Sequence, residues 1–128
     1  MNKEMILEKY PVYIQEIAVD KTTCKSVDEI IEYFKSKIDS DPIATFIEVF
    51  NHYEHTKCLE GGVINPDILD AKNIVFCFGE KLPDPRMLAV RPRSIGVAQM
   101  KEKFVVSFLE APVPHVNDKM QNWVKELN

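Results

Sequence analysis

The period of the hydrophobic pattern changes along the chain, and each change predicts an element. Residues 11–20, PVYIQEIAVD, mix β-branched and aromatic side chains in near alternation, which is typical of a strand. Apolar residues then recur at helical spacing: Val27, Ile30, Ile31, Phe34 and Ile38. Ser26 and Glu29 have the capping-box spacing that opens a helix. The pattern predicts a strand followed by an amphipathic helix over residues 26–39.

Residues 43–58 fit two structures. Asp41-Pro42 suits the start of a helix, and apolar residues keep helical spacing after it, so a helix over 43–58 is one alternative. Against it, the segment TFIEVF gathers β-branched and aromatic residues around one charge, which favours a buried strand. We prefer a strand over residues 44–51.

Three further strands are expected in the second half, where short apolar runs alternate with turn residues. They are NIVFCFG (73–79), SIGVAQM (94–100) and KFVVSFLEA (103–111). The last two bracket a short turn and are expected to form a hairpin. A closing amphipathic helix is predicted over residues 115–127 from the spacing of its apolar side chains: Val116, Met120, Trp123, Val124 and Leu127.

The resulting order, β-α-β-β-β-β-α, predicts an α+β fold. Its expected form is a two-layer sandwich, in which a mostly antiparallel sheet carries two helices on one face. With 128 residues and 45% hydrophobic content, residues 1–128 are expected to form a single domain with one core.

Charge and cysteine usage narrow the classes of protein. The formal net charge is -4 and the charged residues are dispersed, which argues against nucleic-acid binding and against binding to an anionic membrane. The N-terminus lacks a signal-peptide core, and no run approaches the ~20 apolar residues of a membrane span. Three cysteines without close pairing indicate reduced thiols. We expect a cytoplasmic protein, of bacterial type.

One short segment concentrates metal-capable side chains: His52, His55 and Cys58. If the segment were extended, His52 and Cys58 would lie about 20 Å apart and could not share a metal. On a helix, His52 and His55 could reach one ion, with Cys58 a turn beyond. A further ligand such as His115, Cys77 or Glu54 would then be needed. Because the preceding residues favour a strand, His52 is expected at a strand end, separated from the other two.

All three arginines of the chain, Arg86, Arg91 and Arg93, lie within eight residues, whereas the other thirteen basic residues are lysines. The planar guanidinium binds carboxylate or phosphate at two points, so this local choice of arginine can mark an anion site. If the arginine loop folds toward His52, imidazole and guanidinium groups would share one pocket. His52 would then be the candidate general base.

The chain resembles the domain of unknown function 302 family over residues 10–128. The resemblance rests on the order of elements, the strand that ends in Asn51-His52, a glycine some ten residues later, and the Phe78-Gly79 strand end before a proline-containing loop and a hairpin. In that family the strand typically ends in an Asp-His pair, so His52 corresponds by position and Asn51 replaces the acidic residue. The resemblance implies a small α/β domain, often dimeric, and no assigned activity.

Three classes of function follow, in order of preference. The first is a non-enzymatic ligand-binding or interaction protein that forms a homodimer, because two helices cover one face of the sheet and leave apolar residues on the other. The second is a metal- or heme-binding protein that uses His52 and His55. The third is a small enzyme in which His52 acts as base and the arginines hold an anionic substrate.

Overall fold

Six antiparallel strands form one sheet within residues 1–127, which are the residues that this computed structural model describes. Their order across the sheet is β1-β2-β6-β5-β4-β3. The strands are β1 (Asn2–Ile6), β2 (Tyr10–Ala18), β3 (Thr45–Phe50), β4 (Asp70–Cys77), β5 (Arg93–Gln99) and β6 (Lys103–Leu109). The helices are α1 (Val27–Ser40), α2 (His52–Cys58) and α3 (Pro114–Lys125), with 3-10 helices η1 (Val19–Lys21) and η2 (Pro85–Val90).

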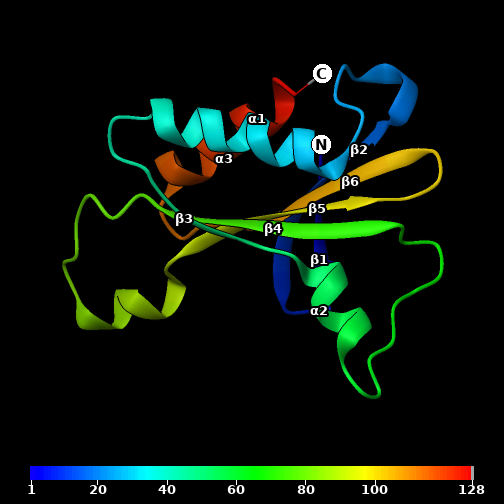
Figure 1. The fold of residues 1–128 in the computed structure, drawn as a ribbon. Coiled ribbons are helices and arrows are strands. Elements are labelled where there is room, and N and C mark those ends of the chain that lie inside the picture. The colour runs from blue at the N-terminus through cyan, green and yellow to red at the C-terminus, as the bar shows by residue number, and fades with distance from the viewer. Residues whose placement is uncertain (128) are drawn as a thin grey trace.

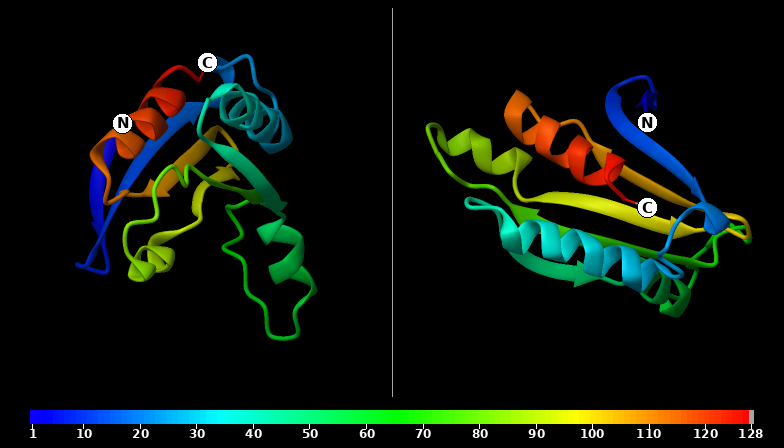
Figure 2. Two further views of the ribbon diagram at one scale, coloured as in Figure 1. Left: turned by 90° about the vertical axis from the view of Figure 1, so that its left-hand side faces the viewer. Right: turned by 90° about the horizontal axis from the view of Figure 1, so that it is seen from above.

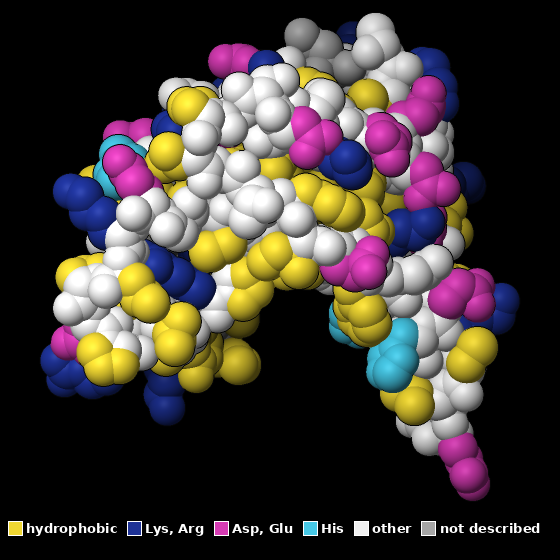
Figure 3. Space-filling model, turned by 60° about the vertical axis from the view of Figure 1, so that its left-hand side comes forward, with side chains coloured by type: hydrophobic (Ala, Val, Ile, Leu, Met, Phe, Trp, Pro, Cys, Tyr) yellow, Lys and Arg dark blue, Asp and Glu magenta, His cyan; other side chains and the backbone are white. Residues whose placement is uncertain are grey.

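The two long helices, α1 and α3, lie on the same face of the sheet (Figure 1). Figure 2 shows that the sheet bends away from these helices, with the β1–β2 hairpin, η2 and α2 extending beyond its other side. The space-filling view shows the molecule as an arch whose hollowed underside carries many hydrophobic side chains (Figure 3). The face turned away from α1 and α3 is called the open face below.

Helix α1 forms where the apolar spacing predicts it. Ser26 is its N-cap, and the Ser26 hydroxyl accepts a hydrogen bond from the backbone N–H of Glu29 at 3.1 Å. The Glu29 carboxylate accepts from the backbone N–H of Lys25 at 2.5 Å. The apolar stripe of the helix is almost completely buried against the sheet: Val27, Ile30, Ile31, Phe34 and Ile38. Burial of this stripe supplies the hydrophobic free energy that docks α1.

Helix α3 completes the same core through aromatic contacts. The Trp123 ring stacks on Phe78 with ring centroids 5.6 Å apart, and it also meets Phe76 at 5.8 Å. The Tyr33 hydroxyl on α1 donates a hydrogen bond to the backbone carbonyl of Trp123 at 2.6 Å, which joins the two helices directly. Both helices and the sheet therefore share one core.

The structure confirms the predicted α+β fold, the mostly antiparallel sheet and the two helices on one face. The preferred strand over residues 44–51 is present as β3. The alternative of one helix over 43–58 is wrong for its first half, while residues 52–58 are helical and form α2. His52 thus lies just beyond the end of β3, as expected, and it begins a helix that also carries His55 and Cys58.

The hydrophobic pattern did not predict strand β1, or α2 as a separate short helix. Strand β1 pairs with β2 at the edge of the sheet, and the connecting turn places Leu7 and Glu8 at positive φ without the glycine or asparagine that usually marks such a turn. Helix α2 begins because Asn51 caps it: the Asn51 amide oxygen accepts from the backbone N–H of Glu54 at 3.0 Å.

Among residues 1–127, no helix combines the length and the apolar character needed to cross a membrane.

Candidate functional site

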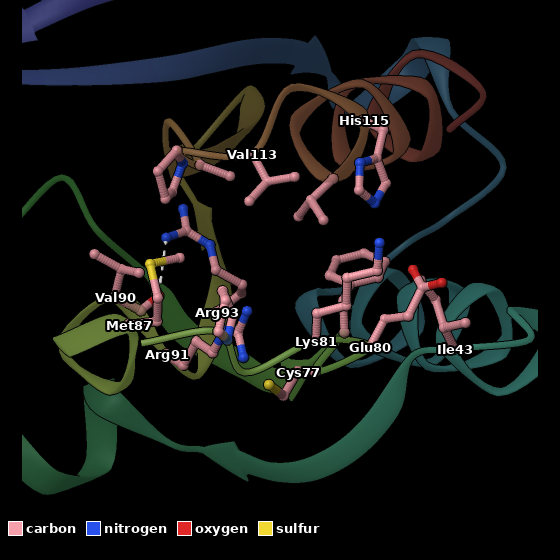
Figure 4. Close-up of a pocket in the computed structure, with 16 residues that line it drawn as sticks. Ile43, Cys77, Glu80, Lys81, Met87, Val90, Arg91, Arg93, Val113 and His115 are labelled. Carbon is pink, nitrogen blue, oxygen red and sulfur yellow. Dashed lines mark hydrogen bonds between the residues drawn. The ribbon is translucent and has the colours of Figure 1, made fainter. Parts of the chain in front are cut away.

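A cavity of about 220 Å³ lies where β4 ends, between η2 and the beginning of α3. Figure 4 shows side chains from these elements facing one another across it. Most of its wall is apolar: Ile43, Phe78, Pro83, Met87, Val90, Ala111, Pro112, Val113 and Val116. Its ionisable side chains are mainly basic: Lys81, Arg91, Arg93 and His115, with Glu80 as the acidic member and the Cys77 thiol beside them. This combination is typical of a small-ligand site, in which an apolar wall carries a few polar groups.

The end of β4 forms one side of the cavity. Phe78 is buried beneath Trp123, and Gly79 then adopts a φ of 56°, a backbone conformation that favours glycine. This turn brings the exposed Glu80 and Lys81 to the rim. Figure 4 shows the His115 imidazole pointing from α3 toward the segment that carries Glu80 and Lys81.

Helix η2 forms the facing side, and a local ion pair fixes its start. Asp84 is its N-cap, and the Asp84 carboxylate accepts from the backbone N–H of Arg86 at 2.8 Å and from Arg86 Nη2 at 2.7 Å. The Arg86 side chain is thereby held at the surface, where 89% of it is exposed. Met87 and Val90 on the same short helix line the cavity instead.

Arg93 is the most unusual side chain of the site, because it is a buried cation without an acidic partner within residues 1–127. Only 8% of the residue is exposed. Its Nη1 donates to the Val90 carbonyl at 3.4 Å and its Nη2 donates to the Leu109 carbonyl, while Nε is buried and has no partner among the described residues. Burial lowers the pKa of Arg93 from its ordinary value, since a charged guanidinium loses hydration there.

The first turn of α3 provides the third side of the cavity. Val113 is the N-cap and makes no side-chain capping bond, and Pro114 follows at the first helical position. Asn117, which is buried, uses its amide oxygen to accept from the backbone N–H of Ala111 at 3.0 Å. This bond folds the connection from β6 against the helix and sets Val113, His115 and Val116 along the cavity.

The predicted site residues separate into two regions. Arg91 and Arg93 line the cavity, whereas Arg86 does not. His52 lines a different groove, on the open face, beside Asn73, Gly96 and Ser107, which lie side by side across β4, β5 and β6. The hypothesis that the arginine loop and His52 form one pocket is therefore wrong.

The imidazole in the arginine cavity belongs to His115, together with Lys81 and Glu80 at the rim. From the sequence, His115 is expected only as a further metal ligand. Its position at the beginning of the predicted closing helix, directly after Pro112 and Pro114, was the signal available. Because the first turn of a helix concentrates unpaired N–H groups, a polar residue there merits attention as part of an anion site.

The His52, His55 and Cys58 cluster does not assemble a metal site. His52 Nδ1 shares a hydrogen bond with the Thr56 hydroxyl at 3.0 Å, and both imidazoles pack against the Phe50 ring, with centroids 5.3 and 5.4 Å away. Within residues 1–127, no three histidine, cysteine, aspartate or glutamate side chains lie together in a way that could hold a metal ion. The three predicted ligands thus remain separate surface side chains.

Comparison with known proteins finds a solved structure with a similar fold. The structure is similar to the crystal structure of an uncharacterized conserved protein, DUF302, from Bacillus stearothermophilus, with a TM-score of 0.69 and 10% sequence identity. The match covers 91% of this chain and 98% of that chain, and it confirms the resemblance at the level of the fold. No curated protein matches the sequence. Residues 1–128 match the model of a family of unknown function, DUF6858, and the chain belongs to that family.

Proposed function

We propose that the protein is a ligand-binding domain that holds a small organic anion in the cavity beside Arg93. The observation that carries this proposal is the burial of Arg93 without a carboxylate partner among the described residues. Removing a charged group from water is costly unless an opposite charge accompanies it. Two backbone carbonyls hold the guanidinium in place but leave its charge uncompensated.

The surrounding charges support an anion as the missing partner. Arg91 and Lys81 reach the same cavity, and among the described residues Glu80 is the acidic side chain that lines it. The Arg91 side chain makes no hydrogen bond or ion pair with the described residues, so its donors are available to a ligand. A guanidinium can bind a carboxylate or a phosphate at two points.

Binding of small carboxylates and phosphate monoesters, followed by amide chemical shifts, tests the proposal. We expect saturable shifts around the cavity, weakened several-fold in Arg91→Gln, because a charge-assisted bond is lost. Arg86→Gln is the matched control, since Arg86 lies in the same loop but pairs with Asp84 outside the cavity. The absence of shifts at millimolar ligand, or equal loss in both variants, would overturn the proposal.

A homodimer is proposed as the assembled form, and the open face supports it. The strand registers put the side chains of Ile6, Phe50 and Leu109 on that face, where these residues remain 46%, 40% and 45% exposed. A second copy that covered this face would remove these side chains from water. Sedimentation velocity across a range of concentrations tests it: Leu109→Lys should favour the monomer, and a wild-type monomer at high micromolar concentration would contradict it.

We also propose a cytoplasmic location, because the cysteines of the chain are free thiols. Cys24, Cys58 and Cys77 form no disulfide, and Cys58 is exposed. Such thiols persist in a reducing compartment. Fractionation of cells that express the full chain, with thiol labelling of Cys58, tests this location, and recovery of the chain outside the cytoplasm or with Cys58 oxidised would contradict it.

A further inference from the structure

We propose that the ligand is a singly charged carboxylic acid with a compact apolar body, and that its carboxylate lies between Arg93 and the N-terminal end of α3. This inference rests on the proposed anion-binding function and names the class of anion. It also assigns a binding role to the start of α3, which forms a wall of the same cavity.

The start of α3 has donors without acceptors. Val113, the N-cap, provides no side-chain acceptor, and Pro114 has no N–H. The N–H of Asn117 is bonded to the Val113 carbonyl at 3.1 Å. The N–H groups of His115 and Val116 are therefore the first-turn donors that have no acceptor within the helix. Helix dipoles favour negative charge at this end, and α3 is twelve residues long.

Arg93 provides the second, independent observation. It comes from the sheet rather than from the helix, and it is more than nine-tenths buried. Two of its five N–H groups are engaged by the Val90 and Leu109 carbonyls, and Nε has no partner among the described residues. Figure 4 shows Arg93 and the first turn of α3 facing the same cavity from different elements. An anion between them would meet positive charge on both sides.

The number of donors favours one negative charge over two. Arg93 is the buried cation of the cavity, and with the two free helix N–H groups it suits the two oxygens of a carboxylate. Lys81 is exposed and Arg91 is partly exposed, so water screens their charges and they attract an anion more weakly than Arg93 does. A phosphate dianion carries more charge and a third terminal oxygen, and such groups are typically held by glycine-rich loops or clusters of several cations. Glu80, at the rim, adds repulsion for a second negative charge.

The wall determines the remainder of the ligand. Ile43, Phe78 and Val116 present apolar surface, and the cavity of about 220 Å³ is smaller than the roughly 300–1,000 Å³ of sites for drug-sized molecules. A short branched or monocyclic acid would fill such a space and bury its hydrocarbon part against these side chains. The cavity thus matches a small apolar acid better than a sugar phosphate or a nucleotide.

Three probes with the same ring separate the classes: benzoate, its neutral analogue benzamide, and phenyl phosphate. Calorimetry with the full chain should show benzoate binding at least ~10-fold more tightly than either analogue, as expected for one charge-assisted contact. Phenyl phosphate binding as tightly as benzoate would overturn the carboxylate assignment and leave the proposed anion binding standing. If neither anion binds, the proposed function itself fails.

A variant at the N-cap tests the role of α3. Val113→Asp places a carboxylate where it can cap the helix, so it should occupy the free N–H groups and reduce benzoate affinity at least ~10-fold while the helix keeps its stability. Val113→Ala is the matched control, because it removes the branched side chain without supplying a cap. Unchanged binding in Val113→Asp, or an equal loss in both variants, would overturn the assignment.

Discussion

The carboxylate of Asp41 and the ammonium of Lys119 lie 2.9 Å apart and join the connection between α1 and β3 to helix α3. The Asp41 side chain is only 8% exposed, and its Oδ1 also accepts from the backbone N–H groups of Ile43 and Ala44 at 3.0 Å. Ile43 and the beginning of α3 both line the cavity, so this ion pair fixes the position of one wall relative to the other.

The Asp41 carboxylate should make stability depend on pH at the acid end. Burial alone would raise its pKa, but the bonds from Lys119, Ile43 and Ala44 outweigh burial and hold the pKa below its ordinary value of 3.8. The stabilisation is therefore complete above that value and is lost as the pH falls through the lower folded-state pKa. Asp41→Asn should lower the free energy of unfolding by about 1–2 kcal/mol at neutral pH and flatten this acid loss. Urea unfolding at several pH values measures both.

The Lys35–Asp39 pair offers a matched control for this prediction. Its nitrogen and oxygen are also 2.9 Å apart, but the two side chains are 36% and 52% exposed. Solvent screens such a pair, so Asp39→Asn should change the free energy of unfolding much less than Asp41→Asn does. Equal effects of the two substitutions would contradict the argument from burial.

The Tyr33 hydroxyl should lose its proton at a higher pH than an ordinary tyrosine, and its raised pKa should make the free energy of unfolding depend on pH at the alkaline end. Burial, followed by the nearby charges of Glu126 and Cys24, raises the pKa of its hydroxyl to about 12. Because the folded-state value exceeds the ordinary value of 10.0, the stabilisation is present below that value and is lost as the pH rises toward 12. Near-ultraviolet absorbance should show one tyrosine that ionises after the others, and Tyr33→Phe should abolish that late step.

The hydrophobic pattern was sufficient to predict most of the fold. The helix beginning at Ser26 and the buried strand around Ile74 each had one dominant period and a clear start or stop residue. Strand β1 lacked such signals, since its five residues are all exposed and carry mixed charges. Its pairing with β2 is a tertiary contact that short-range pattern does not encode.

The candidate site was only partly predictable for a related reason. The concentration of arginines marked the right loop, but the pattern could not show that Arg93 turns inward while Arg86 stays with Asp84. His52 was a candidate because His55 and Cys58 lie close to it in the sequence. The histidine that shares a cavity with Arg91 and Arg93 is His115, which is distant from them in sequence. Which histidine meets the arginine loop depends on strand order, and the sequence contained no direct signal of that order.

Removing the N-cap of α1, Ser26, and removing the N-cap of α2, Asn51, should have different effects on stability. Ser26→Ala removes a cap from α1, whose apolar face is buried in the core, and should lower the free energy of unfolding by about 1 kcal/mol. Asn51→Ala removes the equivalent bond from α2, which has no buried residue. It should therefore open α2 locally, with less than ~0.5 kcal/mol of global effect. Amide hydrogen exchange and urea unfolding distinguish the two outcomes, and an equal global loss would contradict this view of α2.

The turn that follows α2 should require glycine at position 62. A Cβ at this position would lie 2.1 Å from the Thr56 carbonyl oxygen and 3.2 Å from that of Leu59, so Gly62→Ala requires the backbone itself to move. We expect amide shifts throughout residues 52–69, including the groove beside His52, while α1 and α3 keep theirs. Gly96→Ala is the control in the same groove, because its added methyl would lie 3.3 Å from the end of the Asn73 side chain and at an ordinary contact distance of 3.7 Å from Ser107. Shifts in Gly62→Ala no larger than those in the control would show that this turn adapts without rearrangement.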